Sequence, residues 1–162
     1  MHPIRPLGVL AAALVVLALP GSAHAASITQ QFAADSGDAC HYGTTSGTLG
    51  WTYGTTSPLP VSSVAVKGQV SDRPLPTDPA AICTSDGYSS TATFTAYAGS
   101  VEIEQQSRTA DNGTVSFEFT LGKSTAAAAV DRVVVQVCRN PVRTLPPSYC
   151  GKAVTYLAPP IA

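Results

Sequence analysis

The sequence predicts an all-β protein, a two-sheet antiparallel β-sandwich of about eight strands that two disulfides hold together. Three observations lead to this fold class. Apolar and polar residues alternate with a period of two along most of the chain, and helical periodicity is nearly absent. Glycine-rich and proline-rich turn signals separate the alternating runs. All four cysteines lie beyond residue 25, as expected of a disulfide framework in an exported domain.

Residues 1–25 have the three parts of a secretory signal peptide. Arg5 lies in a short polar start, residues 7–19 form an apolar run, and Ala23-His24-Ala25 precede the expected cleavage before Ala26. The apolar run is too short to cross about 30 Å of hydrocarbon comfortably. We therefore expect the rest of the chain, 26–162, to be a single secreted, extracellular domain with no membrane span in its mature form.

The expected mature chain has a weakly acidic balance and a single histidine, His41. The full sequence has 9 Lys and Arg against 10 Asp and Glu, so removal of Arg5 leaves 8 against 10, a net charge of −2. Neither a basic nucleic-acid surface nor a His-rich metal site fits this composition. Charged residues make up 12% of the chain, which leaves few groups for acid–base catalysis. We expect no cofactor, no metal, no nucleic-acid partner and no enzymatic activity.

The first three strands are expected at Ser27–Ala33, Thr48–Tyr53 and Ser62–Val70, which are all alternating runs. In the second run, Trp51 falls on the same side as the apolar residues at positions 49 and 53. In the third run, three valines and Gly68 share one side. Such strands have one buried face and one wet face.

The fourth and fifth strands are expected at Ser90–Ala98 and Val101–Gln106, with a tight glycine turn between them. Glu102 and Glu104 share one face of the expected fifth strand, with Cβ atoms about 7 Å apart. That spacing could suit a carboxylate pair for glycoside hydrolysis. A solvated strand face is the favoured alternative, because Gln106 continues the same polar row.

The sixth strand, Thr114–Leu121, follows an Asn-Gly turn and is expected to bury the face that begins with Val115. The seventh, Val130–Cys138, is apolar on both faces, which is typical of a central strand. Its competitor is a helical turn over Ala126–Val130, where alanines follow one another. The eighth strand is expected at Lys152–Leu157.

The four cysteines allow three pairings. We favour Cys40 with Cys83 and Cys138 with Cys150, because the second pair would close a short proline-bearing loop between two strands. A closed loop of that size stabilises the fold by roughly 3 kcal/mol. A zinc site is the rival interpretation, but the sequence has no Cys-x-x-Cys pair and only His41 could assist.

The interval from Cys40 to Trp51 is similar to that between the first core cysteine and the tryptophan of immunoglobulin domains. The likeness ends there, because Cys83 comes too early and Ala81 stands where that family usually carries a tyrosine. We therefore expect an immunoglobulin-like or jelly-roll-like sandwich without assigning it to a family. Trp51 is expected in the core, with an exposed ligand platform as the alternative.

Catalytic and metal-binding motifs are sparse. His41 directly follows a cysteine that we expect to be bridged, so it is a poor candidate for a general base. The sequence has no Gly-x-Ser-x-Gly, no Gly-rich phosphate loop and no His-Glu-x-x-His. Asp35-Ser36-Gly37-Asp38 offers oxygens to Ca²⁺ but lacks the ligand count of a calcium loop, so a turn is expected there.

One segment between Cys138 and Cys150 carries a run of five residues, Arg143-Thr144-Leu145-Pro146-Pro147. This run resembles the reactive loop of Bowman-Birk serine-protease inhibitors, in which a basic, a hydroxyl and an aliphatic residue and two prolines occur inside a disulfide. The resemblance implies that Arg143 enters an acidic specificity pocket, with Arg143-Thr144 as the reactive bond. Pro141 stands where that family has its cysteine, and the ring here is longer. A strand connection tied by a disulfide is the alternative.

Two classes of function stay open at this point. The first is a non-catalytic extracellular binding or surface-associated module for a protein or a glycan, which needs only a stable secreted β-domain. The second is an inhibitor of trypsin-like serine proteases that acts through the loop from Cys138 to Cys150. An enzyme ranks third. Candidate aromatic contacts of the binding module are Tyr42, Tyr53, Tyr88 and Tyr97.

Overall fold

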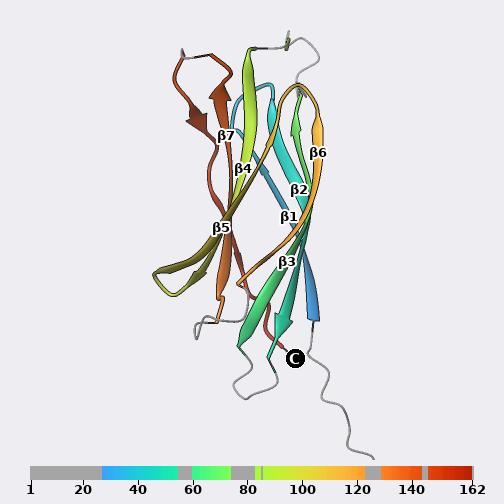
Figure 1. The fold of residues 1–162 in the computed structure, drawn as a ribbon, viewed down its shortest axis with the longest axis vertical. Coiled ribbons are helices and arrows are strands. Elements are labelled where there is room, and N and C mark those ends of the chain that lie inside the picture. Colours follow the sequence, from blue (N-terminus) through green and yellow to red (C-terminus); the bar gives the residue numbers. More distant parts are fainter. Residues whose placement is uncertain are drawn as a thin grey trace, which may run out of the picture.

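The computed structural model describes residues 27–54, 60–73, 83–84, 86–122, 129–143 and 146–161. These residues form nine strands in two antiparallel sheets and no helix (Figure 1). The predicted two-sheet sandwich is confirmed. Within the described ranges, no helix is long and apolar enough to cross a membrane. The expected signal peptide, residues 1–25, and most of the alternative helical turn at 126–130 lie outside the described residues.

The first sheet has four strands in the order β1-β2-β3-β6, and the second has five, in which β5-β4-β7-β8 are neighbours and β9 also pairs with β7. The second strand therefore neighbours the third, whereas in immunoglobulin domains it neighbours the fifth. The chain crosses between the sheets after β3, β5 and β6. The strands are β1 (Ser27–Asp35), β2 (Gly43–Tyr53), β3 (Val61–Asp72), β4 (Tyr88–Ala98), β5 (Val101–Ala110), β6 (Thr114–Leu121), β7 (Arg132–Pro141), β8 (Tyr149–Cys150) and β9 (Val154–Leu157).

Each of the eight predicted strands has a counterpart, and the differences lie at the ends. β2 begins before the predicted Thr48, at Gly43, because small hydroxyl residues there still pair with both neighbours. The hydroxyl of Thr45, for example, donates to the Gln69 carbonyl at 2.9 Å. β8 was not predicted, since it has two residues and its pairing partner is the strand that carries Cys138.

The core faces agree with the predicted alternation. Trp51 is fully buried, and its indole N–H donates to the Gln30 side-chain oxygen at 3.1 Å, so the core prediction is confirmed and the exposed platform is wrong. β7 pairs with three strands, as predicted for a central position. One residue differs, since Val115 is 41% exposed where β6 begins, at the end of the sheet.

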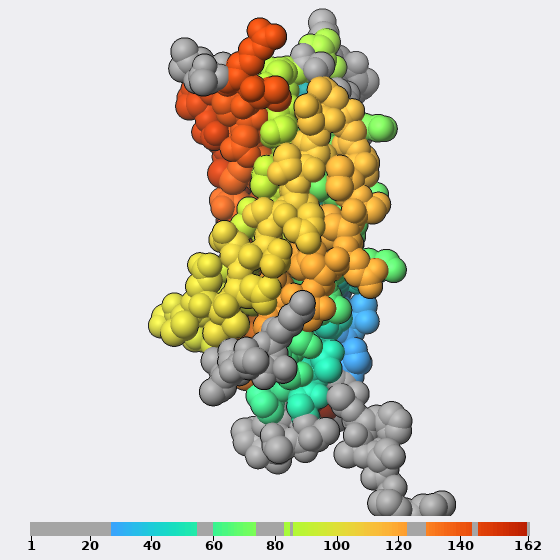
Figure 2. Space-filling model, viewed as in Figure 1, coloured from blue at the N-terminus to red at the C-terminus, as the bar shows by residue number. Residues whose placement is uncertain are grey.

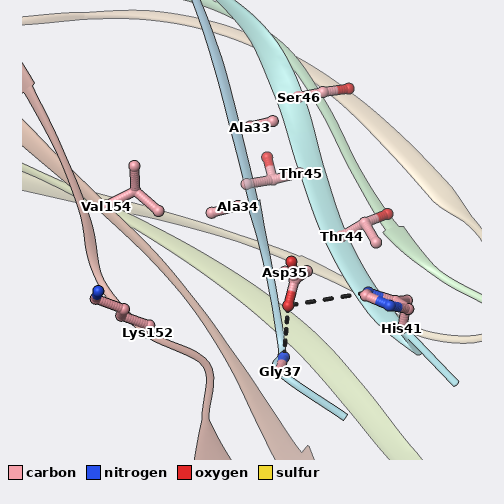
Figure 3. A pocket seen from close by; sticks show the side chains of 10 residues that line it. All are labelled: Ala33, Ala34, Asp35, Gly37, His41, Thr44, Thr45, Ser46, Lys152 and Val154. Atoms are coloured by element: carbon pink, nitrogen blue, oxygen red, sulfur yellow. Dashed lines mark hydrogen bonds and ion pairs between the residues drawn. The ribbon is translucent and has the colours of Figure 1, made fainter. Parts of the chain in front are cut away.

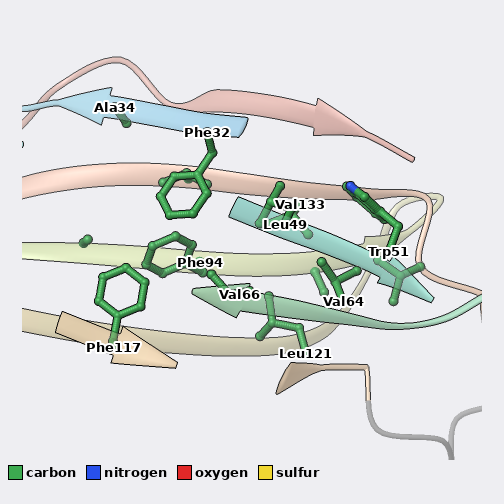
Figure 4. Packing of buried hydrophobic residues seen from close by; sticks show 14 of the residues in the cluster. Phe32, Ala34, Leu49, Trp51, Val64, Val66, Phe94, Phe117, Leu121 and Val133 are labelled. Carbon is green, nitrogen blue, oxygen red and sulfur yellow. The ribbon is translucent and has the colours of Figure 1, made fainter. Parts of the chain in front are cut away.

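The middle of the core is a row of residues that pair across the first sheet: Phe32 with Gly47, Gly47 with Gly68, and Gly68 with Phe117. Phe94 reaches this row from the second sheet, with ring centroids 5.3 Å from Phe32 and 5.2 Å from Phe117. Figure 4 shows its ring between the two others. A Cβ on Gly68 would lie 3.0 Å from the Phe32 ring, so the glycines leave room for aromatic packing. We call these five residues the aromatic centre.

Side chains close both open sides of the sandwich. Between β1 and β9, the Tyr156 hydroxyl accepts from the Ala33 N–H and donates to the Ala33 carbonyl, both at 2.8 Å. Between β5 and β6, the Arg108 guanidinium lies 4.5 Å from the centre of the Phe119 ring. These contacts link edge strands that share no ladder.

Candidate functional site

The described ends of four connections lie at one end of the sandwich, and these connections are 36–42, 73–87, 111–113 and 142–148. The strand register brings them there, because the paired residues next to each connection lie in one row of their sheet. We call this region the loop end. It is the upper end in Figures 1 and 2, where the orange-red residues after β7 stand near the orange turn before β6.

A buried arginine lies beneath the loop end. Arg139, on β7, is 1% exposed and donates to both carboxylate oxygens of Asp86 at 2.6 and 2.7 Å. It also donates to the Ser90 hydroxyl at 2.6 Å and forms an ion pair with Asp72. Burial of a guanidinium is costly unless such partners surround it. We call Arg139, Asp86, Ser90 and Asp72 the arginine network.

The arginine network extends to the turn between β5 and β6. Asp72 is buried, and its carboxylate accepts from the Ser90 hydroxyl at 2.7 Å and from the Asn112 N–H at 2.8 Å. The Asp72 N–H donates to the Gly113 carbonyl at 2.7 Å. Arg139 therefore holds two of the four connections in place: 111–113 through Asp72, and 73–87 through Asp86.

Tyrosine rings surround the same guanidinium. The centres of the Tyr42 and Tyr88 rings lie 5.1 and 5.6 Å from the Arg139 Cζ. Tyr149 meets Tyr88 edge to face at 5.7 Å. Burial raises the pKa of Tyr149, and the adjacent Arg139 acts in the opposite direction. Tyr42 and Tyr88 thus come together as predicted contact residues at the loop end.

Both disulfides lie at the loop end, and both predicted pairings are confirmed. Cys40 is bonded to Cys83, which joins the first connection to the second, and Cys138 is bonded to Cys150 across β7 and β8. All four cysteines are paired, so the rival zinc interpretation is wrong. The loop end is covalently tied at two places.

Arg143 lies beside a hollow of about 390 Å³ at the loop end. Asp86 and Gly87 line one part of it, and Asp111 and Asn112 line another, with Val142, Arg143 and Pro146 completing the lining. The Val142 N–H donates to the Gly87 carbonyl at 2.9 Å, which anchors the chain immediately before Arg143. The side chains of Val142 and Arg143 are exposed. A rigid base therefore presents an apolar and a cationic side chain together.

The remaining predicted contact residues lie in different parts of the molecule. Pro146 and Pro147 are exposed at the loop end, and Thr144 and Leu145 lie outside the described residues. Tyr53 belongs to the core, where its hydroxyl donates to the Pro159 carbonyl, and it is too buried to serve as a contact residue. Tyr97 lies near the opposite end, with the Arg132 guanidinium 4.6 Å from its ring centre.

The carboxylate pair for glycoside hydrolysis, the less favoured of the two interpretations of the fifth strand, is wrong. Glu104 pairs with Ala96 and Glu102 pairs with the next residue, Tyr97, because β5 has a bulge at Ile103. Cross-strand partners lie on the same face of a sheet, so the bulge puts the two carboxylates on opposite faces. Glu104 accepts from the buried Gly122 N–H at 3.0 Å, whereas Glu102 is exposed. They cannot flank one glycosidic bond.

The connection between β1 and β2 forms the predicted turn around Asp38. Its carboxylate accepts from the Cys40 and Tyr42 N–H groups at 3.1 and 3.2 Å, and from the Ser36 hydroxyl. Burial raises the pKa of Asp38, but these hydrogen bonds outweigh it, so the pKa is lowered from 3.8. His41 has a φ of 45°, which this turn maintains.

Arg139, the residue that organises the loop end, was not among the residues predicted to form a site. A signal was present, because Arg139 continues the row of Val133, Val135 and Val137 at alternate positions of β7. A charged residue in a buried apolar row needs a partner of opposite charge. The partners, Asp72 and Asp86, come from distant parts of the sequence, so the row alone could not identify them.

Comparison of the chain with models of protein families, with curated proteins and with solved structures finds no match. In the described part of the chain, no group of three or more His, Cys, Asp or Glu side chains is placed to hold a metal ion. Tyr42, Tyr88, Arg143, Pro146 and Pro147, five of the residues predicted to make contacts, gather at the loop end, so it is the candidate functional site.

Proposed function

We propose that this protein is a secreted, non-catalytic binding module whose loop end contacts an extracellular protein or glycan. The observation that carries the proposal is the exposure of Val142 and Arg143 beside a hollow whose base is fixed by the arginine network and two disulfides. Disulfides of this kind are compatible with an oxidising, extracellular location.

Rigidity below the surface supports a role in binding. A binding loop that is already ordered loses less conformational entropy when its partner arrives. Here the chain before Arg143 is anchored to Gly87, and the Tyr88 hydroxyl donates to the Pro147 carbonyl on the other side of the loop, at 3.4 Å. Val142 and Arg143 would therefore meet a partner with little rearrangement.

The exposed side chains favour a protein partner over a glycan. Val142 is 58% exposed and Tyr149 is 37% exposed, on either side of Arg143 in the same disulfide-closed segment. Arginine and tyrosine are enriched among the residues that dominate binding energy in protein interfaces. An apolar residue next to an arginine suits a partner surface that pairs an acidic group with an apolar patch.

The test is a binding screen of the purified protein against arrays of extracellular proteins and of glycans. Val142→Ser and Arg143→Ala should each lower the affinity for the partner about tenfold or more. The matched control is Leu157→Ser, which removes another exposed aliphatic side chain, 65% exposed, near the opposite end of the sandwich. If the two loop-end variants bind as the control does, the loop end is not the binding surface.

Protease inhibition is the second candidate, and one observation favours it. The disulfide between Cys138 and Cys150 closes a ring around an exposed Arg143, which is the arrangement that the Bowman-Birk resemblance requires. Stoichiometric titration of trypsin should then show inhibition that Arg143→Ala abolishes, because the basic side chain pairs with the acidic specificity pocket. Unchanged trypsin rates at micromolar excess, or rapid cleavage after Arg143, would exclude the inhibitor.

A further inference from the structure

A second hollow, of about 590 Å³, lies on the side of the sandwich where β1, β2 and the chain after Cys150 meet (Figure 3). Ala33, Ala34 and Val154 give it an apolar lining. It shares no lining residue with the hollow beside Arg143. Binding in this hollow would therefore be independent of binding at the loop end.

Two contacts hold the chain after Cys150 against β1, one at each end of this hollow. The backbone of Gly151 packs directly on that of Asp35, since a Cβ on Gly151 would overlap the Asp35 carbonyl oxygen. Further along the chain, the Tyr156 hydroxyl makes two hydrogen bonds to Ala33. The segment between these two contacts, which contributes Lys152 and Val154, is held beside β1 at both of its ends. The hollow is therefore a built feature of the fold.

Opposite charges lie on the two sides of the hollow. Asp35 ends β1 on one side, with the His41 Nδ1 3.9 Å from its Oδ1, and Lys152 lies on the other side (Figure 3). The Asp35 carboxylate also accepts from the Gly37 N–H at 2.7 Å, which orients it. A simple anion would be attracted by Lys152 but repelled by Asp35, and a simple cation would meet the reverse. A ligand that carries both charges satisfies both sides.

We propose that this hollow binds a small zwitterion with an apolar body, such as a short apolar peptide with free termini. Its carboxylate lies against the Lys152 ammonium, its amino group lies against the Asp35 carboxylate, and its side chains contact Ala34 and Val154. The volume falls in the range of about 300–1,000 Å³ that is usual for small-molecule sites. The two charged contacts set the orientation, and the apolar lining supplies the contact area.

A ligand series tests the charge requirement. The full protein is titrated with Leu-Leu, followed by NMR shifts of the backbone amides of β1 and β2. Leu-Leu should saturate a single site with shifts that centre on Ala34 and Thr45. N-acetyl-Leu-Leu and Leu-Leu amide each lose one charged contact and should bind about tenfold more weakly or worse. Gly-Gly, which lacks the apolar side chains, should not saturate the site.

Substitutions of the two charged lining residues test whether Leu-Leu binds in this hollow. Lys152→Met should weaken Leu-Leu binding about tenfold and should remove the preference for Leu-Leu over Leu-Leu amide. The matched control, Lys67→Met, removes an exposed lysine from the outer face of the first sheet and should bind as the wild type does. Asp35→Asn keeps an oxygen for the Gly37 N–H and should remove the preference over N-acetyl-Leu-Leu.

Circular dichroism should be used to check that each variant is folded. If Asp35→Asn does not fold, the comparison of Lys152→Met with Lys67→Met decides alone. The proposal is overturned if Leu-Leu does not saturate at millimolar concentration. It is also overturned if capped and free peptides bind equally well, or if Lys152→Met and Lys67→Met behave alike. None of these results depends on whether the Arg143 loop binds a partner.

Discussion

The aromatic centre and the arginine network are both buried, but they are held together by different forces. In the aromatic centre, Phe94 packs between rings of the first sheet over two glycines, so shape and dispersion provide the stability. In the arginine network, Arg139 lies between two carboxylates, so charge and hydrogen bonds provide it. The first joins the two sheets, and the second joins the sheets to their connections. The buried interior is apolar in the middle of the sandwich and polar at the loop end, where the arginine network holds the connections in place.

Of the substitutions considered, loss of Arg139 should lower the free energy of unfolding most. Arg139→Met leaves Asp72 and Asp86 without their cation, and breaking a buried ion pair costs about 3–5 kcal/mol of the free energy of unfolding. Urea unfolding measures the loss. Adding Asp72→Asn and Asp86→Asn to the variant should recover part of it, because no uncompensated charge then remains.

The control for this variant is Arg108→Met. Arg108 stacks on Phe119 at the side of the sandwich, where a cation–π contact contributes about 0.5–1 kcal/mol. Equal losses for the two arginine variants would mean that burial of the charge at Arg139 has no special role.

The aromatic centre should be sensitive to volume and indifferent to charge. A Cβ on Gly47 would overlap the Lys67 carbonyl oxygen, so Gly47→Ala forces the two strands apart and should cost about 1–3 kcal/mol. Gly50→Ala is the control on the outer face of the same strand, where the added Cβ would lie 3.5 Å from that of Ala65. Its unfolding free energy should change by no more than about 0.5 kcal/mol. A similar loss for both variants would contradict the close packing of the row.

The smallest expected effect concerns pH at the loop end. Hydrogen bonds lower the pKa of Asp38 in the folded state, so its contribution to stability is present above the ordinary aspartate pKa of 3.8. That contribution is lost as the pH falls through the lowered value. Asp38→Asn should therefore be less stable than the wild type at pH 7, and the difference should shrink in acid. Urea midpoints at neutral and acid pH measure this, and a difference that does not change with pH would count against the carboxylate.

Alternation along the chain predicted the strands because each has one face in the core, as the buried valines of β3 show. Cysteine spacing likewise predicted the pairing of Cys138 with Cys150. Register was not predictable, since the bulge at Ile103 depends on how β5 meets β4 in space. The arrangement around Arg139 was missed for a related reason, because Asp72 and Asp86 reach it only after the sheets have packed.

The hydroxyl of Tyr156 has a consequence for how molecules of this protein behave together. β1 is an edge strand, and an edge with unpaired N–H and C=O groups is a template on which another chain can add a strand. Tyr156 uses both groups of Ala33 and lies across the path that an incoming strand would take. Tyr156→Phe would free these two backbone groups, so we expect the concentrated variant to aggregate more readily than the wild type.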